Sequence, residues 1–264
     1  MADKATQTAA PRAAGPQPAA APPATWFLDA NTLRCIVQQE TNLTKGDEVY
    51  VASLKIRTTP SVAGTTSVVF TGGLVNIANV NTGETHPIPN AMGRVPFANV
   101  TRLGATEIAA GQVPEIIATA TLVFEADLTR KAKVEKLLTE AADEIEPILA
   151  EASENVVVED LLDEGVLEDL LDQLIDDITE AVELTVGQKL LLFFGAVGDP
   201  DDPIERKVNV FFAVDDVLAP LVDTLVGNKL DPDLGVGGGV RTRTYTQRFS
   251  GRGATYDISF TLSK

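Results

Sequence analysis

Acidic residues gather where predicted strands end, so that carboxylates from different loops could meet and bind a cation. The candidates are Asp47, Glu48, Glu125, Asp127, Asp201, Asp202, Asp215 and Asp216. Loops at one end of a β-sandwich lie close together, and Ca²⁺ takes about 6–8 oxygen ligands at about 2.3–2.6 Å. We therefore treat these residues as candidate metal ligands, with calcium as the one cofactor that the sequence suggests.

A structural role explains the same residues without a metal. Aspartate is a preferred helix N-cap and turn initiator. Asp127 and Asp216 each precede a helical pattern and fit that role. The sequence contains no linear calcium loop of the EF-hand type, so the calcium hypothesis requires that the acids converge in space.

Enzymatic chemistry has weaker support, and we identify no catalytic residue. A carboxylate-dependent hydrolase would need two acids about 5–9.5 Å apart beside a groove. Asp47, Glu125, Asp201 and Asp215 are the candidates, but the chain has one Trp and three Tyr to line a groove for sugars. A histidine-activated nucleophile would have to use His86, the only histidine, which lies in a proline-rich segment.

The single cysteine and a glycine-rich segment both favour structural roles. Cys35 lies in the apolar run Leu33–Val37 and fits a small buried side chain, and one cysteine excludes an intramolecular disulfide or a zinc site of several thiolates. Residues 235–239 are rich in glycine, but a strand pattern follows them. A phosphate-binding loop requires a helix at that point, so we interpret the segment as a turn.

The acidity of the chain belongs to one segment. The 264 residues carry a formal net charge of −17. Residues 134–186 contain eighteen acids and one lysine, which sum to −17, whereas the other residues contain twenty acids and twenty bases. This asymmetry indicates a separate structural part, and it disfavours binding to a phosphate backbone, so we expect no nucleic-acid partner.

Two amphipathic helices are predicted in this segment. Apolar residues recur at steps of three and four between Val134 and Leu149 and again between Leu161 and Val182, with carboxylates on the other face. Pro147 would kink the first helix or end it at Glu146. The acidic face is either ordinary solvated surface or a docking surface for a basic partner. A further alternative is an effector or toxin-like protein whose amphipathic helices rearrange on a membrane.

A basic cluster near the C-terminus could complement the acidic helices. It consists of Arg241, Arg243, Arg248 and Arg252. Alternate residues such as Arg241 and Arg243 share one face of a strand. The cluster could meet the acidic helices of the same molecule or of a neighbour, which suggests head-to-tail association, or it could consist of solvated arginines.

The rest of the chain has a β pattern. Segments rich in Val, Ile, Thr and Phe are bounded by Gly, Pro, Asn or Asp, and they lie at 33–38, 49–57, 67–77, 116–124, 189–194, 207–214, 243–249 and 255–262. A short helix is predicted at 217–226. We therefore predict a mainly β fold with a helical insertion: an antiparallel β-sandwich of about eight strands plus an acidic two-helix hairpin. A doubly wound α/β fold is the alternative.

Four parts follow from these patterns. Residues 1–25 are an Ala- and Pro-rich tail, 26–128 the first half of the sandwich, 129–187 the acidic helical insertion, and 188–264 the second half. The sequence starts without the apolar core of a secretory signal and has no long apolar stretch. We expect a soluble, cytoplasmic protein, with export by another route left open.

Two short stretches resemble calcium-dependent β-sandwich modules of the C2 type. They are Thr44–Tyr50 and Phe124–Asp127. The resemblance covers a few residues and implies no role for any of them. Our main hypothesis is a non-catalytic binding or assembly module, with calcium as a candidate ligand and the acidic insertion as the interaction surface.

Overall fold

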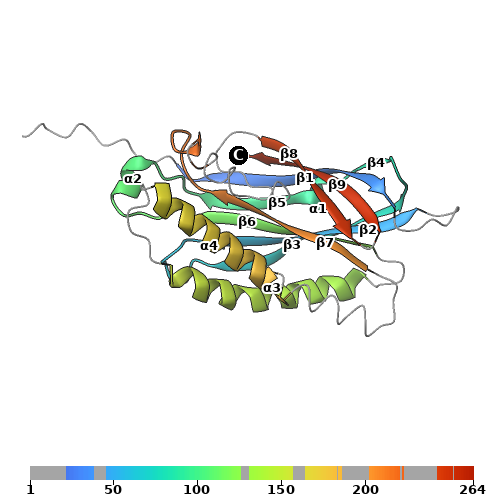
Figure 1. Cartoon of the computed structure of the whole chain (residues 1–264), viewed down its shortest axis with the longest axis horizontal. Coiled ribbons are helices and arrows are strands. Elements are labelled where there is room, and N and C mark those ends of the chain that lie inside the picture. The colour runs from blue at the N-terminus through green and yellow to red at the C-terminus, as the bar shows by residue number, and fades with distance from the viewer. Residues whose placement is uncertain are drawn as a thin grey trace, which may run out of the picture.

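The protein is mainly β, with two antiparallel sheets and four helices among its described residues (Figure 1). A computed structural model describes residues 22–38, 46–125, 131–156, 164–182, 184–185, 202–220, 222, 243–251 and 253–264. The predicted fold class, a β-sandwich with a helical insertion, is confirmed.

The described residues form thirteen strands and helices in chain order. The strands are β1 (Ala24–Val37), β2 (Asp47–Thr58), β3 (Ser67–Val80), β4 (Thr85–Pro87), β5 (Arg94–Val100), β6 (Ile116–Glu125), β7 (Asp202–Phe212), β8 (Arg243–Gly251) and β9 (Ala254–Ser263). The helices are α1 (Asn90–Gly93), α2 (Ala105–Ala109), α3 (Lys131–Glu154) and α4 (Glu164–Val182).

Sheet B, as we call it, has the strand order β3-β2-β6-β7. All neighbours are antiparallel, and β6 pairs with β2 over ten residues from Ile116 to Glu125. Every residue of β6 is buried, because one of its faces packs on the second sheet and the other packs on helices. A strand that is covered on both faces needs no alternation with exposed polar residues, which explains why seven of its ten residues are apolar.

Sheet A, as we call it, has β1 at its centre. One edge of β1 pairs with β9, and β9 pairs with β8; the other edge pairs with β5 near Trp26 and with β4 near Leu33. In β9, buried Tyr256, Ile258 and Phe260 alternate with half-buried polar residues. This period of two places one face of sheet A against sheet B and the other face toward solvent.

The helical insertion forms a third layer on sheet B. Figure 1 shows α3 and α4 on the side of sheet B that faces away from sheet A. One apolar core lies between the helices and sheet B, where Leu138 and Ile145 pack with Leu54 and Phe124. A second core lies between the sheets and includes Trp26 and Phe260. The helices therefore cover a sheet face that would otherwise expose apolar side chains.

The two sheets meet closely where β7 lies beside β8. The Ser250 N–H donates to Glu205 Oε2 at 2.7 Å, and the Tyr245 hydroxyl donates to Asn209 Oδ1 at 2.7 Å. A Cβ atom on Gly251 would collide with the carbonyl oxygen of Ile204. The glycine is therefore required for this approach of the two backbones.

Several predicted boundaries differ from the structure. Pro147 does not end the first helix, since α3 continues to Glu154. The sequence patterns did not predict β4, β5, α1 or α2. The predicted strand 189–194 lies outside the described residues, as does half of the predicted helix 217–226, of which residues 219, 220 and 222 are helical. Of the helices in the described ranges, none has the length and apolar character needed to cross a membrane.

Candidate interaction surface

The amphipathic pattern of the insertion determines which side chains face solvent. Along α3, Val134, Leu138, Ala141, Ile145 and Leu149 are buried against sheet B. Their spacing of three and four residues places them on one stripe of the helix. Most of the carboxylates between them, such as Glu140, Asp143 and Glu144, are consequently exposed to solvent.

We call the exposed carboxylates of the two helices the acidic face. Its members are Glu140, Asp143, Glu144, Glu151 and Glu154 of α3 and Asp169, Asp176 and Glu180 of α4. α3 also carries Lys131, Lys133 and Lys136, whereas α4 contains no lysine or arginine. The acidic face is therefore most negative along α4.

Carboxylates of α4 repel one another. Desolvation, followed by the charges of Asp176 and Asp169, raises the pKa of Asp172 above its ordinary value. Desolvation, followed by the charges of Asp176 and Glu180, raises the pKa of Asp177. These directions mean that negative charge on α4 is unfavourable in the isolated molecule, and a nearby positive charge would relieve it.

Two carboxylates of α3 accept hydrogen bonds from the backbone of β3, a role that the sequence pattern did not predict. Glu146 Oε2 accepts the backbone N–H of Val68 at 3.0 Å, and Glu135 Oε1 accepts that of Leu74 at 3.3 Å. Both N–H groups belong to β3, one of the two edge strands of sheet B. Part of the acidity of α3 therefore caps donors of a sheet edge, which would otherwise be available for pairing with another chain.

The C-terminal end of α3 is fixed to the loop after β2. The Thr58 and Ser153 hydroxyls lie 2.7 Å apart, and the Ser61 N–H donates to the Ser153 carbonyl at 2.9 Å. The Ser61 hydroxyl also donates to the carbonyl of Val156. Ser61 adopts a positive φ, in the left-handed region, and these bonds hold it there.

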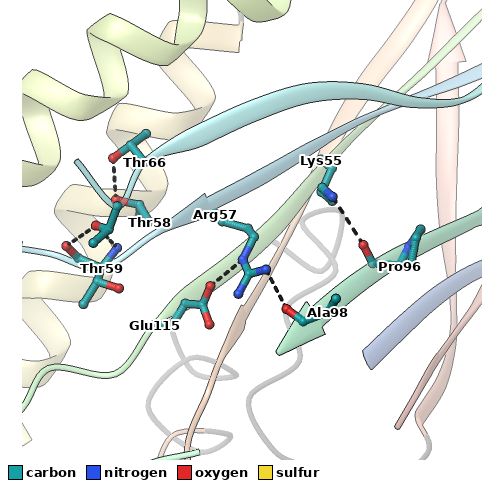
Figure 2. Close-up of polar contacts among 9 residues, drawn as sticks. Lys55, Arg57, Thr58, Thr59, Thr66, Pro96, Ala98 and Glu115 are labelled. Carbon is teal, nitrogen blue, oxygen red and sulfur yellow. Dashed lines mark hydrogen bonds and ion pairs between the residues drawn. The ribbon is translucent and has the colours of Figure 1, made fainter. Parts of the chain in front are cut away.

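Basic side chains of β2 bind backbone carbonyl groups of β5, an edge strand of sheet A. Figure 2 shows Lys55 and Arg57 of β2 reaching toward the edge strand β5. Arg57 donates to the Ala98 carbonyl at 2.7 Å and to Glu115 at 2.5 Å, and Lys55 Nζ lies 3.5 Å from the Pro96 carbonyl oxygen. Desolvation and the charge of Arg57 lower the pKa of Lys55. The two side chains connect the sheets through backbone acceptors of β5.

The predicted metal ligands divide between the two ends of sheet B. Glu125 pairs in register with Asp202, and Val49, two residues after Asp47, pairs with Glu125 on its other side. Asp47, Glu48, Glu125 and Asp202 therefore share one end, and we call them the end-of-sheet acids. Asp215 and Asp216 follow the far end of β7. Asp127, Asp201 and the side chain of Asp202 lie outside the described residues.

The described part of the chain contains no group of three or more His, Cys, Asp or Glu side chains arranged to hold a metal ion. Asp47 and Glu125 are 1% and 3% exposed. The Tyr256 hydroxyl donates to Asp47 Oδ2. Calcium binding stays a prediction, because several of the proposed ligands are not described.

Asp47 belongs to a buried cluster with Tyr256 and Cys35. Burial, then the hydrogen bond and charge of Asp47, raises the pKa of Tyr256 above its ordinary range. Burial, then the charge of Asp47, raises the pKa of Cys35 from 9.0 to about 11. Cys35 is 0% exposed, as predicted for a small buried side chain. The cluster keeps the thiol and the phenol protonated, which suits a structural role.

At the far end of sheet B, Asp215 and Asp216 have different partners. Asp215 Oδ1 accepts the N–H groups of Val217 at 3.0 Å and Leu218 at 2.9 Å. Asp216 lies 3.6 Å from Arg102 and 3.5 Å from Lys264. The capping role predicted for Asp216 thus belongs to Asp215, and Asp216 is an exposed ion-pair partner instead.

Of the predicted arginine cluster, Arg248 is the member whose side chain is described. It forms a bidentate ion pair with Asp257 at 2.8 and 3.0 Å on the solvent face of sheet A. Arg243 begins β8, and its side chain is not described; Arg241, Arg252 and residues 235–239 lie outside the described residues. His86 lies 3.2 Å from Glu84 at the rim of sheet A.

The fold and the acidic face together define a three-layer β-sandwich with a strongly anionic helical surface. No protein family matches the chain, and searches of curated proteins and of solved structures find no match.

Proposed function

We propose that this protein is a non-catalytic binding or assembly module whose interaction surface is the acidic face. The observation that carries the proposal is the orientation of the insertion: its apolar stripe is buried on sheet B, so its carboxylates are presented to solvent. The closely spaced carboxylates of the acidic face repel one another, which costs free energy in the isolated molecule. A basic partner would remove that cost.

The raised pKa values of Asp172 and Asp177 support this proposal. A cationic side chain near α4 would favour the ionised carboxylates and gain from their field. The surface is exposed, so each ion pair contributes little by itself, and the affinity would come from many pairs and would fall with salt.

Binding of a fluorescent oligolysine peptide tests the proposal. We expect the Kd to increase at least tenfold between 50 and 500 mM NaCl. Replacing Asp169 and Asp176 by Asn should weaken binding more than replacing Glu84 and Asp216 by Gln and Asn, which removes the same charge elsewhere. Equal weakening by both variants would mean that the acidic face is not the binding surface.

The two alternatives require features that the proposal does not need. Action on a membrane would require α3 and α4 to leave sheet B and expose residues such as Leu138 and Ile145, both 0% exposed. A hydrolase that uses Asp47 and Glu125 would require water and substrate to reach two buried carboxylates. We therefore prefer the binding module, with calcium as a candidate ligand of the end-of-sheet acids.

A further inference from the structure

We infer that the partner of the acidic face is the solvent face of sheet A on a second copy of this chain, so that molecules associate head to tail. The inference rests on the proposed function, since it identifies the partner of the same surface. It follows from the chemistry, position and size of the two faces.

The solvent face of sheet A is lined with hydrogen-bond donors. Hydroxyl and amide side chains follow the strands in register: Thr32 lies opposite Ser259, which lies opposite Thr246, and Asn31 donates to Thr261. Further hydroxyls come from Thr244, Thr255 and Ser250. Ionised carboxylates only accept hydrogen bonds, so this face offers the groups that the acidic face lacks.

Arginines give the same face a positive excess. Arg34 and Arg248 both lie opposite Asp257, which Arg248 occupies with a bidentate ion pair. Arg34 is exposed, and Arg94 beside Asp29 is 43% exposed at its side chain. The described charges of this face are therefore three arginines against two aspartates. Guanidinium groups bind carboxylates through paired N–H donors, which favours contact with the acidic face.

The two faces lie on opposite sides of the molecule. Sheet A forms one outer layer and the helices the other, with sheet B between them (Figure 1). A molecule cannot bring its own two faces together, and contact between unlike faces of two copies leaves one face of each free. Such heterologous contacts form open chains or rings rather than closed two-fold dimers.

The faces also match in size. The solvent face of sheet A is about four strands wide at ~4.8 Å spacing and about ten residues long at ~3.3 Å per residue, so its area is about 600 Å². α3 has 24 residues. A helix of that length extends ~36 Å, and two helices ~10 Å apart cover about 700 Å². Stable interfaces bury ~800 Å² on each partner, so each face is near the size that one specific contact requires.

Sedimentation velocity on the full chain tests this inference. A sheet variant combines Arg34→Gln with Thr246→Glu, and a helix variant combines Asp169→Lys with Asp176→Lys. We expect the parent to associate at 50 mM NaCl and to associate at least tenfold more weakly at 500 mM NaCl. Each variant alone should be monomeric. An equimolar mixture should form a one-to-one dimer and stop there, because one intact face of each kind remains.

A matched control makes the same net charge change of −2 in exposed loops, with Ala63→Glu and Gln112→Glu, and should associate like the parent. Thermal melts confirm that all variants are folded. A parent that stays monomeric at low salt while it still binds oligolysine overturns this inference and leaves the proposed function standing. Loss of oligolysine binding as well would overturn both. A mixture that stays monomeric, or a control that dissociates, overturns the head-to-tail contact.

Discussion

Alkaline unfolding of the buried cluster around Asp47 offers a quantitative test of the structure. The pKa of Cys35 is raised from 9.0 to about 11 because the thiol is buried beside Asp47. An unfolded chain loses this proton near pH 9, whereas the folded chain keeps it. Above pH 9 the unfolded state therefore binds fewer protons than the folded state, and the free energy of unfolding must fall as the pH rises.

The size of this effect follows from the shift of the Cys35 pKa, which spans about two pH units. Each pH unit is worth about 1.4 kcal/mol. Because each state is half-titrated at its own pKa, the thiol alone removes about 1.9 kcal/mol of stability between pH 9 and 11, out of about 2.7 kcal/mol for the full shift. The pKa of Tyr256 is raised from its ordinary value of 10.0, so the phenol acts in the same direction above pH 10. Together the two groups remove about 3 kcal/mol between pH 9 and 11.

Urea denaturation of the parent and of Cys35→Ala at pH 8, 9, 10 and 11 measures the difference. The chain has one cysteine, so the variant removes the whole thiol contribution. Its free energy of unfolding should fall by about 1.9 kcal/mol less than that of the parent between pH 9 and 11. Thiolate absorbance of the folded parent should increase near pH 11. Parallel curves for the two proteins, or thiolate formation near pH 9, would refute the buried cluster.

Three further predictions concern single contacts and the metal. Glu146 accepts a β3 N–H, whereas Glu151 of the same helix is exposed. In urea denaturation, Glu146→Ala should lower the free energy of unfolding by about 1.5–3 kcal/mol, because it removes a charged acceptor. The control Glu151→Ala should change it by about 0.5 kcal/mol or less. A Cβ on Gly251 would collide with the backbone of Ile204, whereas a Cβ on Gly111, which has a positive φ, would meet open space. Gly251→Ala should therefore cost at least about 1 kcal/mol more than Gly111→Ala. If the end-of-sheet acids bind calcium, 1–5 mM Ca²⁺ should raise the Tm and produce heat in calorimetry; absence of both would exclude it.

The regular strands could be predicted because their periodicity is local. In β9, polar and buried residues alternate without interruption, and in β6 seven of the ten residues are apolar. The start of β1 was missed because Asp29 interrupts the apolar pattern. In the structure Asp29 pairs with Arg94 at 2.6 Å on the outer face of sheet A. β5 was missed because it contains Pro96, which an edge strand tolerates since its outer backbone groups need no strand partner.

The acidic face could be predicted from composition and helical spacing, but the tasks of individual acids could not. Glu146 resembles its exposed neighbours in sequence, and only the position of the β3 edge shows that it accepts the Val68 N–H. Asp47 was selected as a loop acid at a strand end, and its partner Tyr256 is 209 residues away in the chain. Contacts over such separations depend on the pairing of the sheets, which local pattern does not encode.

The burial of β6 on both faces makes the insertion inseparable from the sandwich. Its outward side chains, such as Ala120 and Phe124, belong to the core beneath the helices, and its inward ones, such as Ile117 and Val123, belong to the core between the sheets. Deleting residues 131–182 would therefore strip a core rather than remove an appendage. We expect both cores to melt in a single cooperative transition and the amides of β6 to be among the slowest in hydrogen exchange.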